Sequence, residues 1–432
     1  MMEGWKEISL NKIGWFKGAG VNKLINSDER PVYLVNYMDV YKHWRVYYNT
    51  NYQEVTAKDR EIEEANLLEG DVLFTPSSEK PIDIGHAGVV METMPNCVYS
   101  YHLIRLRLYD KTRFDLKFLS YLLNSDDVQE HFVSRASGSG IRYTLSLSDF
   151  KTAKISFPEK SEQTTIANIL SKVDEAIASV QGSIAAAERL KKSLMQNLLT
   201  GRMKPDGTLR KEDEFYMDEK FGKVPMGWEV KRVGEVFDTY PTASYSRSKL
   251  LETGNCKYIH YGDIHTKFDT FLDVSNTDLP YISDDMIKNF VFLKDGDIVI
   301  ADTSEDYEGV GKLVEIRNIG ENKVISGLHT LLIRSKSDTL INGYKGYMFN
   351  EERVMLSLLK YVTGIKVYSI SKSCLARVVI PIPTKKEQEQ IKNKLDSVNS
   401  MIQQKKEGIT TMERLKKSLM QNLLTGKVRI NP

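Results

Sequence analysis

The stretch Glu188-Arg-Leu-Lys-Lys-Ser-Leu-Met-Gln-Asn-Leu-Leu-Thr-Gly201 recurs without one change as Glu413 to Gly426. A run of this length does not recur by chance, so the chain is one unit written twice. The two halves are similar without being identical. This arrangement favours a molecule that binds two different ligands at a fixed separation.

An apolar seam leads into each copy of the repeat. Its residues recur at steps of three and four, the period of an amphipathic helix and close to that of a coiled coil. The first seam comprises Ile166, Leu170, Val173, Ile177, Val180, Ile184, Ala187, Leu190, Leu194 and Leu198. The second comprises Ile391, Leu395, Val398, Ile402, Lys405, Ile409, Met412, Leu415, Leu419 and Leu423. A proline precedes each helix and a glycine follows at the C-terminal cap position (Pro158, Gly201; Pro383, Gly426).

Neither helix can bury so long a stripe by itself. We therefore predict that the two helices pack against each other as a long antiparallel two-helix coiled coil within the chain. The alternative is that each helix packs on the globular part of its own half. Lys405, which stands where the first seam has Val180, either fixes the register of the pair or extends its ammonium group to solvent.

The segments that precede the two helices also correspond. Tyr37-Met-Asp-Val40 corresponds to Tyr261-Gly-Asp-Ile264, and Leu68-Glu-Gly-Asp-Val-Leu-Phe74 corresponds to Lys294-Asp-Gly-Asp-Ile-Val-Ile300. These are short β-rich runs between turn residues, with short helical pieces among them. Each half is thus predicted to be an α+β globule followed by a long helix. The predicted division is a first globule, helix and polar linker, then a second globule, helix and tail (residues 1–158, 159–201, 202–226, 227–383, 384–426 and 427–432).

The composition is that of an ordinary globular protein, with 41% hydrophobic and 27% charged residues in a chain of 432. No stretch approaches the roughly 18 apolar residues that span a bilayer, and the first residues lack the apolar core of a signal peptide. The 3 cysteines are never in C-x-x-C spacing, which favours a reducing compartment. We expect a cytoplasmic protein without membrane contact. With a net charge of only +2, a nucleic-acid-binding chain must gather its cations on one face.

The sequence carries no recognisable catalytic motif. It has no Asn/Asp-Pro-Pro-Tyr/Phe sequence of the kind used for adenine methylation and no glycine loop for S-adenosylmethionine. Gly309-Val-Gly-Lys-Leu313 has leucine where a phosphate loop needs serine or threonine. The histidines and cysteines show no zinc-ligand spacing. We predict a non-catalytic chain with no cofactor or metal of its own.

The order of these motifs, occurring twice, resembles the specificity subunit of type I restriction-modification enzymes. The resemblance covers essentially the whole chain, from a Gly-Trp start to a Pro-x-Pro segment, the helix start Glu387-Gln-x-x-Ile391 and the Leu-Leu-Thr-Gly helix end. It implies that each globule is a target-recognition domain and that the helices are spacers holding the domains apart. It also implies an asymmetric, bipartite site in double-stranded DNA. The implied partners are two copies of an adenine-N6 methyltransferase subunit and ATP-dependent restriction subunits, and these would contain the S-adenosylmethionine, ATP and magnesium.

Base readout needs Arg, Lys, Asn, Gln, Ser and Thr on protruding loops, with phosphate contacts that fix the register. Three loops of the first globule offer such residues: 42–48, 75–80 and 137–143. The predicted contacts there are Lys42, Arg45, Tyr47, Ser77, Lys80, Ser139, Arg142 and Tyr143. The corresponding contacts in the second globule are Arg247, Lys249, Thr303, Ser304, Lys366 and Tyr368. The alternative for each loop is an exposed hairpin without a ligand.

The repeated block offers a second kind of site. Identity between halves that differ in ligand favours a shared partner, docked twice about a pseudo-twofold axis. The predicted partner-binding residues are Arg189, Lys192, Leu194, Leu198, Arg414, Lys417, Leu419 and Leu423. The alternative is that identity preserves only helix packing. Two other functions stay open: a coiled-coil scaffold whose globules bind proteins, and a diverged nuclease or methyltransferase with its own active site.

Overall fold

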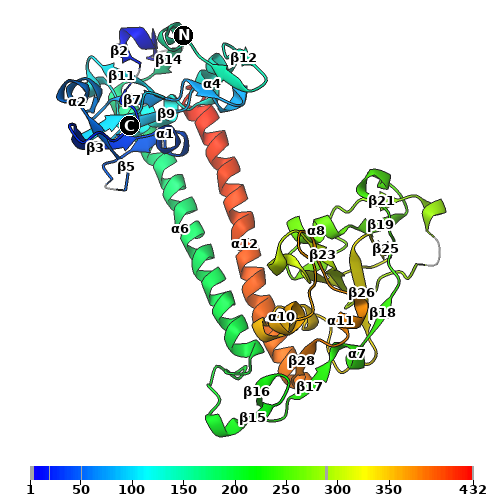
Figure 1. Ribbon diagram of the computed structural model, residues 1–432. Coiled ribbons are helices and arrows are strands. Elements are labelled where there is room, and N and C mark those ends of the chain that lie inside the picture. Colours follow the sequence, from blue (N-terminus) through cyan, green and yellow to red (C-terminus); the bar gives the residue numbers. More distant parts are fainter. Residues whose placement is uncertain (1–3, 19, 50, 288–289, 431–432) are drawn as a thin grey trace. The chain divides into compact units, whose positions relative to one another are not determined.

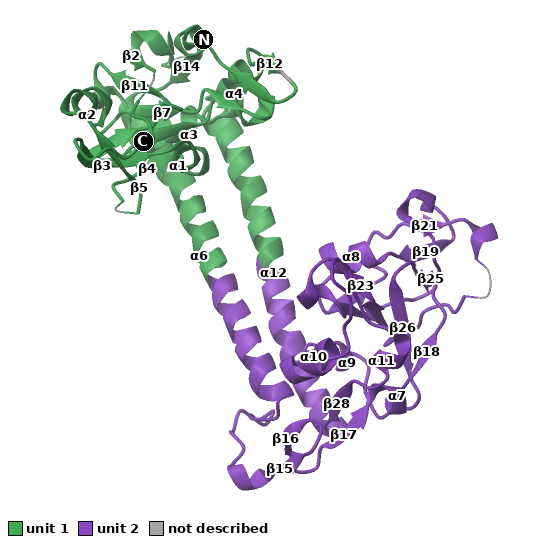
Figure 2. Ribbon diagram, viewed as in Figure 1, with its two compact units in different colours: residues 1–182, 406–432 green, residues 183–405 purple. Residues whose placement is uncertain are grey.

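The structure is a computed structural model (Figure 1), and it describes residues 4–18, 20–49, 51–287 and 290–430. The chain forms two compact units: unit 1 is residues 1–182 with 406–432, and unit 2 is residues 183–405 (Figure 2). The division falls inside each of the two long helices, α6 (Lys160–Leu199) and α12 (Lys385–Leu423). Each unit therefore contains one globule, the first part of the helix that follows it and the last part of the other helix.

The globule of unit 1 is built on two mixed sheets. Strands rich in branched apolar residues form their centres, because such residues pack well on a pleated surface that is buried. The five-stranded sheet has the order β2 (Gly14–Lys17), β11 (Ile104–Leu108), β7 (Val72–Phe74), β9 (Ala87–Val90) and β4 (Arg45–Val46). The four-stranded sheet has the order β5 (Gln53–Ala57), β3 (Arg30–Val35), β10 (Met94–Tyr99) and β6 (Asn66–Leu67).

Smaller elements complete this globule. A ribbon of β1 (Lys6–Ser9) and β14 (Lys154–Phe157) ties the start of the globule to the strand that leads into α6. A three-stranded sheet has the order β12 (Ser137–Ser139), β13 (Arg142–Thr144) and β8 (Ser77–Ser78). The short helices are α1 (Tyr37–Lys42), α2 (Asp59–Ala65), α3 (Leu116–Leu122), α4 (Asp126–Val133) and α5 (Leu147–Thr152).

The globule of unit 2 repeats this plan. Its five-stranded sheet has the order β18 (Phe237–Tyr240), β26 (Thr330–Ser335), β22 (Ile298–Ala301), β24 (Leu313–Arg317) and β20 (Phe271–Asp273). Its second sheet has the order β21 (Tyr281–Ile282), β19 (Cys256–Ile259) and β25 (Lys323–Ser326), and two ribbons join β17 (Glu229–Arg232) to β28 (Val379–Ile382) and β23 (Thr303–Ser304) to β27 (Tyr368–Ser369). The short helices are α7 (Val233–Val236), α8 (Tyr261–Thr266), α9 (Lys345–Phe349), α10 (Glu352–Leu359) and α11 (Lys372–Leu375). The predicted duplication of an α+β globule followed by a helix is confirmed.

The two long helices pack together inside each unit. In unit 1, Ile166 and Leu170 of α6 share one buried core with Leu423, the last residue of α12, and Leu424, which follows it. In unit 2, the core shared by the helices contains Leu198, Leu199, Ile391 and Leu395. Because the start of one helix lies beside the end of the other in both units, the helices run antiparallel. Each of these cores also includes residues of the globule, so the helices pack both on each other and on the globules.

The seam is less continuous than its spacing predicts. Leu190 and Leu415 occupy seam positions, but they are 48% and 51% exposed. Ile184 and Ala187 of the first seam are buried, so burial alternates along the helix. Lys405 is half-buried in the position that corresponds to Val180.

The predicted polar linker is a folded part of unit 2. It forms a hairpin of β15 (Phe215–Asp218) and β16 (Gly222–Pro225). Phe221 and Val224 insert into the core of the unit. The polar composition of this segment conceals these few apolar residues, and they suffice to attach it.

Candidate functional site

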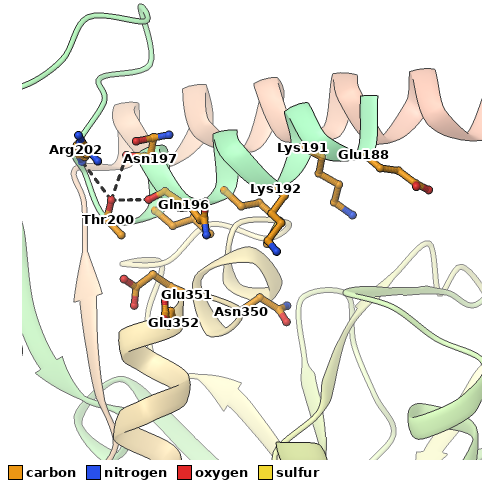
Figure 3. A pocket seen from close by; sticks show the side chains of 12 residues that line it. Glu188, Lys191, Lys192, Gln196, Asn197, Thr200, Arg202, Asn350, Glu351 and Glu352 are labelled. Atoms are coloured by element: carbon orange, nitrogen blue, oxygen red, sulfur yellow. Dashed lines mark hydrogen bonds between the residues drawn. The ribbon is translucent and has the colours of Figure 1, made fainter. Parts of the chain in front are cut away.

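The repeated block borders a groove in unit 2. The groove has a volume of about 610 Å³ and lies between the end of α6 and the segment 350–352, where α10 begins. In Figure 3, Lys192 points from the helix toward Asn350, and Glu351 lies below the end of the helix that carries Gln196 and Thr200. The block contributes Glu188, Lys191, Lys192, Met195, Gln196 and Thr200 to the lining.

Unit 1 has the matching groove, with a volume of about 320 Å³. It lies between the end of α12 and residues 124–127, where α4 begins. The same members of the repeated block line it, namely Glu413, Lys416, Lys417, Met420, Gln421 and Thr425. Trp44 adds an aromatic wall that the other groove lacks. The internal repeat therefore forms two related grooves, one in each unit.

The two walls of each groove differ in charge. The helical wall supplies two lysines and one glutamate in both cases, whereas the opposite wall supplies Glu351 and Glu352 in unit 2 and Asp126 and Asp127 in unit 1. Glu351 is already engaged, because its carboxylate accepts from the Val354 backbone N–H at 2.9 Å. Each groove thus offers charges of both signs beside the apolar atoms of a methionine.

The predicted partner-binding residues fall into two groups. Arg189, Lys192, Arg414 and Lys417 are exposed on the helices, where a partner can reach them. Leu198 and Leu423 are 0% and 3% exposed and belong to the cores of their own units. Leu194 and Leu419 are half-buried against those same cores. The four leucines thus pack in or against the cores of the chain itself. Their predicted contact with a partner stays a prediction.

A half-buried polar cluster attaches α6 to the globule of unit 1. Asp174 of α6 accepts from the Tyr121 hydroxyl at 2.6 Å and pairs with Lys416 of α12 at 2.7 Å. Burial and the bond to Asp174 raise the pKa of Tyr121 to about 12, so its hydroxyl remains a donor. Arg45 stacks over the Tyr121 ring at 4.7 Å and donates to Ser120 at 3.1 Å. Arg45 therefore packs against α3 and α6, where it also donates to the Ser171 hydroxyl of α6 at 3.4 Å.

Unit 2 builds the same cluster from different residues. Asp396 of α12 accepts from the Tyr347 hydroxyl at 2.7 Å and pairs with Arg317 at 3.3 Å. Arg317 belongs to β24, whereas Arg45 of unit 1 belongs to β4, which corresponds in sheet order to β20. An arginine reaches an aspartate of the long helix in both units, but neither position is shared: the arginines belong to different strands, and in the repeat Asp174 corresponds to Asn399 and Asp396 to Ser171.

A second contact holds each helix start. The Gln163 side chain donates to the Pro158 carbonyl at 2.9 Å, and Gln388 donates to the Pro383 carbonyl at 2.8 Å. The glutamate before each glutamine binds an arginine that follows the other copy of the repeat, as Glu162 with Arg429 and Glu387 with Arg210. The Thr384 to Glu387 pattern is typical of a capping box. The Glu387 carboxylate instead accepts from Arg210 at 2.5 Å and from the Trp228 indole at 2.8 Å.

Three of the predicted DNA contacts of the first globule share one hollow. Ser77, Lys80 and Arg142 line a space of about 670 Å³ beside the three-stranded sheet. Arg142 donates to the Ser77 hydroxyl at 2.9 Å, and Tyr143 pairs with Ser78 across the strands. Ser139 lies in β12, and its side chain is outside the described part of the structure.

The remaining predictions for this globule lie elsewhere. Lys42 ends α1, and Tyr47 is 49% exposed just after β4; neither lines the hollow. The hollow contains residues that the loop patterns missed, notably Tyr37, Tyr41 and His102. The two tyrosines stack at 5.9 Å on one face of α1. Their spacing of four residues was the available signal, because such residues are neighbours on a helix.

The second globule arranges its predicted contacts around a different cluster. Thr303 and Ser304 pair with Ser369 and Tyr368 in the β23–β27 ribbon. The Thr303 carbonyl lies 2.9 Å from the His265 ring nitrogen, and His265 packs edge-on against Tyr261.

Arg247 joins this region through a buried carboxylate. It pairs at 2.9 Å with Asp263, which Lys267 also approaches to 3.0 Å. Burial acts to raise the pKa of Asp263, but these two cations outweigh burial and lower it. Lys249 and Lys366 are exposed. His329, which lies 3.5 Å from Asp302, was not among the predicted residues, because its approach depends on strands distant in sequence.

Among the described residues, no group of three or more His, Cys, Asp or Glu side chains could hold a metal ion. The helices in the same part of the chain include none with the length and apolar character to cross a membrane.

The fold defines a duplicated α+β protein. In each unit, the end of the long helix from the other half of the sequence packs in the core. Residues 2–189 and 225–411 match the type I restriction modification DNA specificity domain. The chain therefore belongs to this family and carries the domain twice. The resemblance noted from the sequence is confirmed.

Curated relatives match over most of their length. The type I restriction enzyme MjaVIII specificity subunit of Methanocaldococcus jannaschii is 26% identical over 388 residues, which cover 88% of this chain and 83% of the relative. The putative type I restriction enzyme MjaX specificity subunit of the same organism is 24% identical over 381 residues, covering 86% and 82%.

Solved structures share the fold. The S subunit of a type I restriction-modification system from M. genitalium aligns with a TM-score of 0.52 at 14% identity, covering 97% of this chain and 96% of that one. A chain from a structure concerning complex assembly and conformational transition of the type I R-M system aligns with a TM-score of 0.59 at 17% identity, covering 98% of both. At these identities the likeness concerns the fold alone.

Proposed function

We propose that this chain is the non-catalytic DNA-recognition subunit of a type I restriction-modification complex and reads an asymmetric, bipartite site. Each globule reads one half of the site through the polar strands β8 and β13 or β23 and β27 and their neighbouring loops. The observation that carries this proposal is one framework with two different surfaces. The sheet orders correspond between units, whereas the hollow of unit 1 is built from tyrosines and the cluster of unit 2 from histidines. Different surfaces on one frame suit different half-sites.

The two grooves are proposed to dock two copies of one methyltransferase subunit. Support comes from the exposed members of the repeated block, which include Arg189, Lys192 and their counterparts. Helix packing does not explain why exposed positions are identical in the two copies of the block, because exposed side chains take no part in the cores. A single partner segment with charges of both signs would fit both grooves.

The chemistry is assigned to the partners. S-adenosylmethionine would be bound by the methyltransferase subunits, and ATP and magnesium would be used in the restriction subunits. This chain would contribute sequence recognition only. Purified chain should therefore neither bind S-adenosylmethionine nor cut DNA with added magnesium, and either activity would favour the diverged enzyme instead.

The recognition proposal is tested by mapping modified adenines in cells that carry this chain with its methyltransferase. Exchange of residues 1–158 for the first globule of another family member should change one half of the methylated sequence and leave the other half unchanged. The donor globule must supply counterparts of Trp44 and Tyr121, because Lys416 lies over both rings. An unchanged motif, or a change in both halves, would refute the assignment of one globule to each half.

The docking proposal is tested through stoichiometry. Lys192→Glu should remove one methyltransferase copy and Lys417→Glu the other, so the double variant should bind neither. Lys172→Glu is the matched control, because Lys172 is exposed on α6 outside the repeated block. Light scattering of the purified complexes reports the copy number. Two copies retained by the double variant would reject the grooves as docking sites and leave DNA recognition untouched.

A further inference from the structure

One isoleucine in each globule is almost wholly exposed. Ile141 is 86% and Ile365 is 92% exposed, the highest values among the large apolar residues that the structure describes. A single exposed apolar residue is ordinary on a protein surface. Here both residues occupy the same place in the duplicated fold, at the tip of the loop whose outgoing strand pairs with β8 or β23. Their shared place calls for a shared ligand.

The backbone of the first tip projects its isoleucine outward. Ser139 pairs with Arg142, which leaves Gly140 and Ile141 as the two residues of the turn. Gly138 has φ of +150°, and a Cβ there would lie 2.2 Å from the Arg142 carbonyl oxygen. Gly140 has φ of +66°, as two-residue hairpin turns require. The turn is thus fixed by glycines, and Ile141 takes no part in packing it.

The second tip uses the same device in a loop that is one residue shorter between the corresponding pairs, Ser137 with Thr144 and Thr363 with Ser369. Thr363 and Ser369 form a bridge that closes the loop. Gly364 has φ of +133°, and a Cβ there would lie 2.0 Å from the Val367 carbonyl oxygen. Ile365 follows this glycine directly. Both tips therefore hold an isoleucine on a constrained turn that contributes nothing to the core.

The surroundings of the tips point to a nucleic acid. A cation follows each isoleucine, Arg142 in unit 1 and Lys366 in unit 2. Ile141 borders the hollow with the Ser77 and Ser78 hydroxyls, Lys80 and His102, and also with the acids Glu79 and Asp83. Cations, hydroxyls and carboxylates together provide phosphate contacts and donors and acceptors for base edges. A protein shared by both tips would instead meet unlike neighbours in the two units, since the histidine cluster of unit 2 replaces the tyrosines of unit 1.

We propose that Ile141 and Ile365 enter the major groove of the two half-sites and contact apolar atoms on base edges, chiefly the thymine methyl group. This inference rests on the proposed function, because it assumes that each globule reads one half-site. The major groove, about 12 Å wide, admits a two-stranded ribbon. An isoleucine at the ribbon tip meets the bases, while the following cation meets the phosphates beside them.

Salt dependence separates this contact from an electrostatic one. Each phosphate neutralised by a cation adds about 0.9 to the slope of log affinity against log salt, whereas an apolar contact releases no counterions. In the complex of this chain with its methyltransferase, Ile141→Ala and Ile365→Ala should each weaken DNA binding about tenfold, the loss expected from roughly 60 Å² of apolar contact. Their salt slopes should equal that of the unmodified complex. Arg142→Ala and Lys366→Ala should lower the slope by about 0.9 each.

The controls are Ile25→Ala in unit 1 and Met217→Ala in unit 2, which remove side chains that are 74% and 75% exposed outside the tips. Both should bind DNA as the unmodified complex does, and all variants should keep their melting temperatures. Isoleucine variants that bind as tightly as the controls, or that change the salt slope, would overturn the inference. A complex with no salt-dependent DNA binding would instead overturn the proposed function itself.

Replacement of single thymines by uracil in the mapped site tests the base contact. At one position of each half-site, uracil should weaken binding by the unmodified complex but not by the matching isoleucine variant. Equal losses in both complexes at every position would exclude the thymine contact.

Discussion

Leu423→Ala, near the end of the chain, should loosen the first globule, and Leu198→Ala should loosen the second. Leu423 is 3% exposed and lies in the core of unit 1, whereas Leu198 is 0% exposed and lies in the core of unit 2. A buried leucine replaced by alanine costs about 3 kcal/mol, from lost apolar burial and the cavity left behind. Each helix end should therefore stabilise the globule of the other half.

Amide hydrogen exchange measures this because it reports local stability unit by unit. A loss of about 3 kcal/mol corresponds to roughly hundredfold faster exchange of amides that open with the core. Leu423→Ala should accelerate exchange in β7 and β9 while leaving β22 unchanged, and Leu198→Ala should do the reverse.

Leu415→Ala is the matched control. It removes the same side chain from the same helix, at a position that is 51% exposed, so its effect should stay within about 0.5 kcal/mol. Faster exchange in both units after a single substitution, or only in the unit opposite to the one named, would refute the assignment of the helix ends.

Three further outcomes follow from the same contacts. Glu387→Ala should lower the free energy of unfolding in urea by about 3 kcal/mol, because it leaves Arg210, whose side chain is 9% exposed, without its carboxylate. Glu162→Ala should lower it less, since its partner Arg429 is 45% exposed. Equal losses in the two variants would contradict the role of burial. Burial lowers the pKa of His260, and its ring accepts from the Gly262 N–H. The stability that depends on the neutral ring is therefore complete above about pH 6.5 and falls as the pH decreases. The unfolding temperature of unit 2 should fall over the same pH range, and His260→Asn should reduce this pH dependence. Seven residues inserted into each long helix, after Gly182 and after Lys405, should lengthen the gap of the methylated site by about 3 base pairs. The reason is that 7 residues add roughly 10 Å of helix. Mapped adenines with an unchanged gap would reject the spacer role.

The sequence was most informative where a pattern depends on local geometry. The period of the seams defined both long helices to within a few residues, since side chains three and four apart share a helix face. The repeated block was likewise visible in the sequence, because it is a direct identity of residues. Polar composition misled at residues 202–226, where the side chains of Phe221 and Val224 outweigh their neighbours by entering a core.

The sequence by itself determined that the chain is a duplicated α+β protein with two long helices, and it indicated the family. Only the tertiary structure decided which globule each helix end belongs to, because the two copies of the block are identical and carry no local signal of their neighbours. It also decided that Arg45 and Arg317 reach aspartates at non-equivalent positions of the two helices from different strands, and that Tyr37 and His102 share a hollow with Arg142. Such contacts join residues far apart in sequence, and they are fixed by the packing of whole sheets and helices rather than by any local pattern.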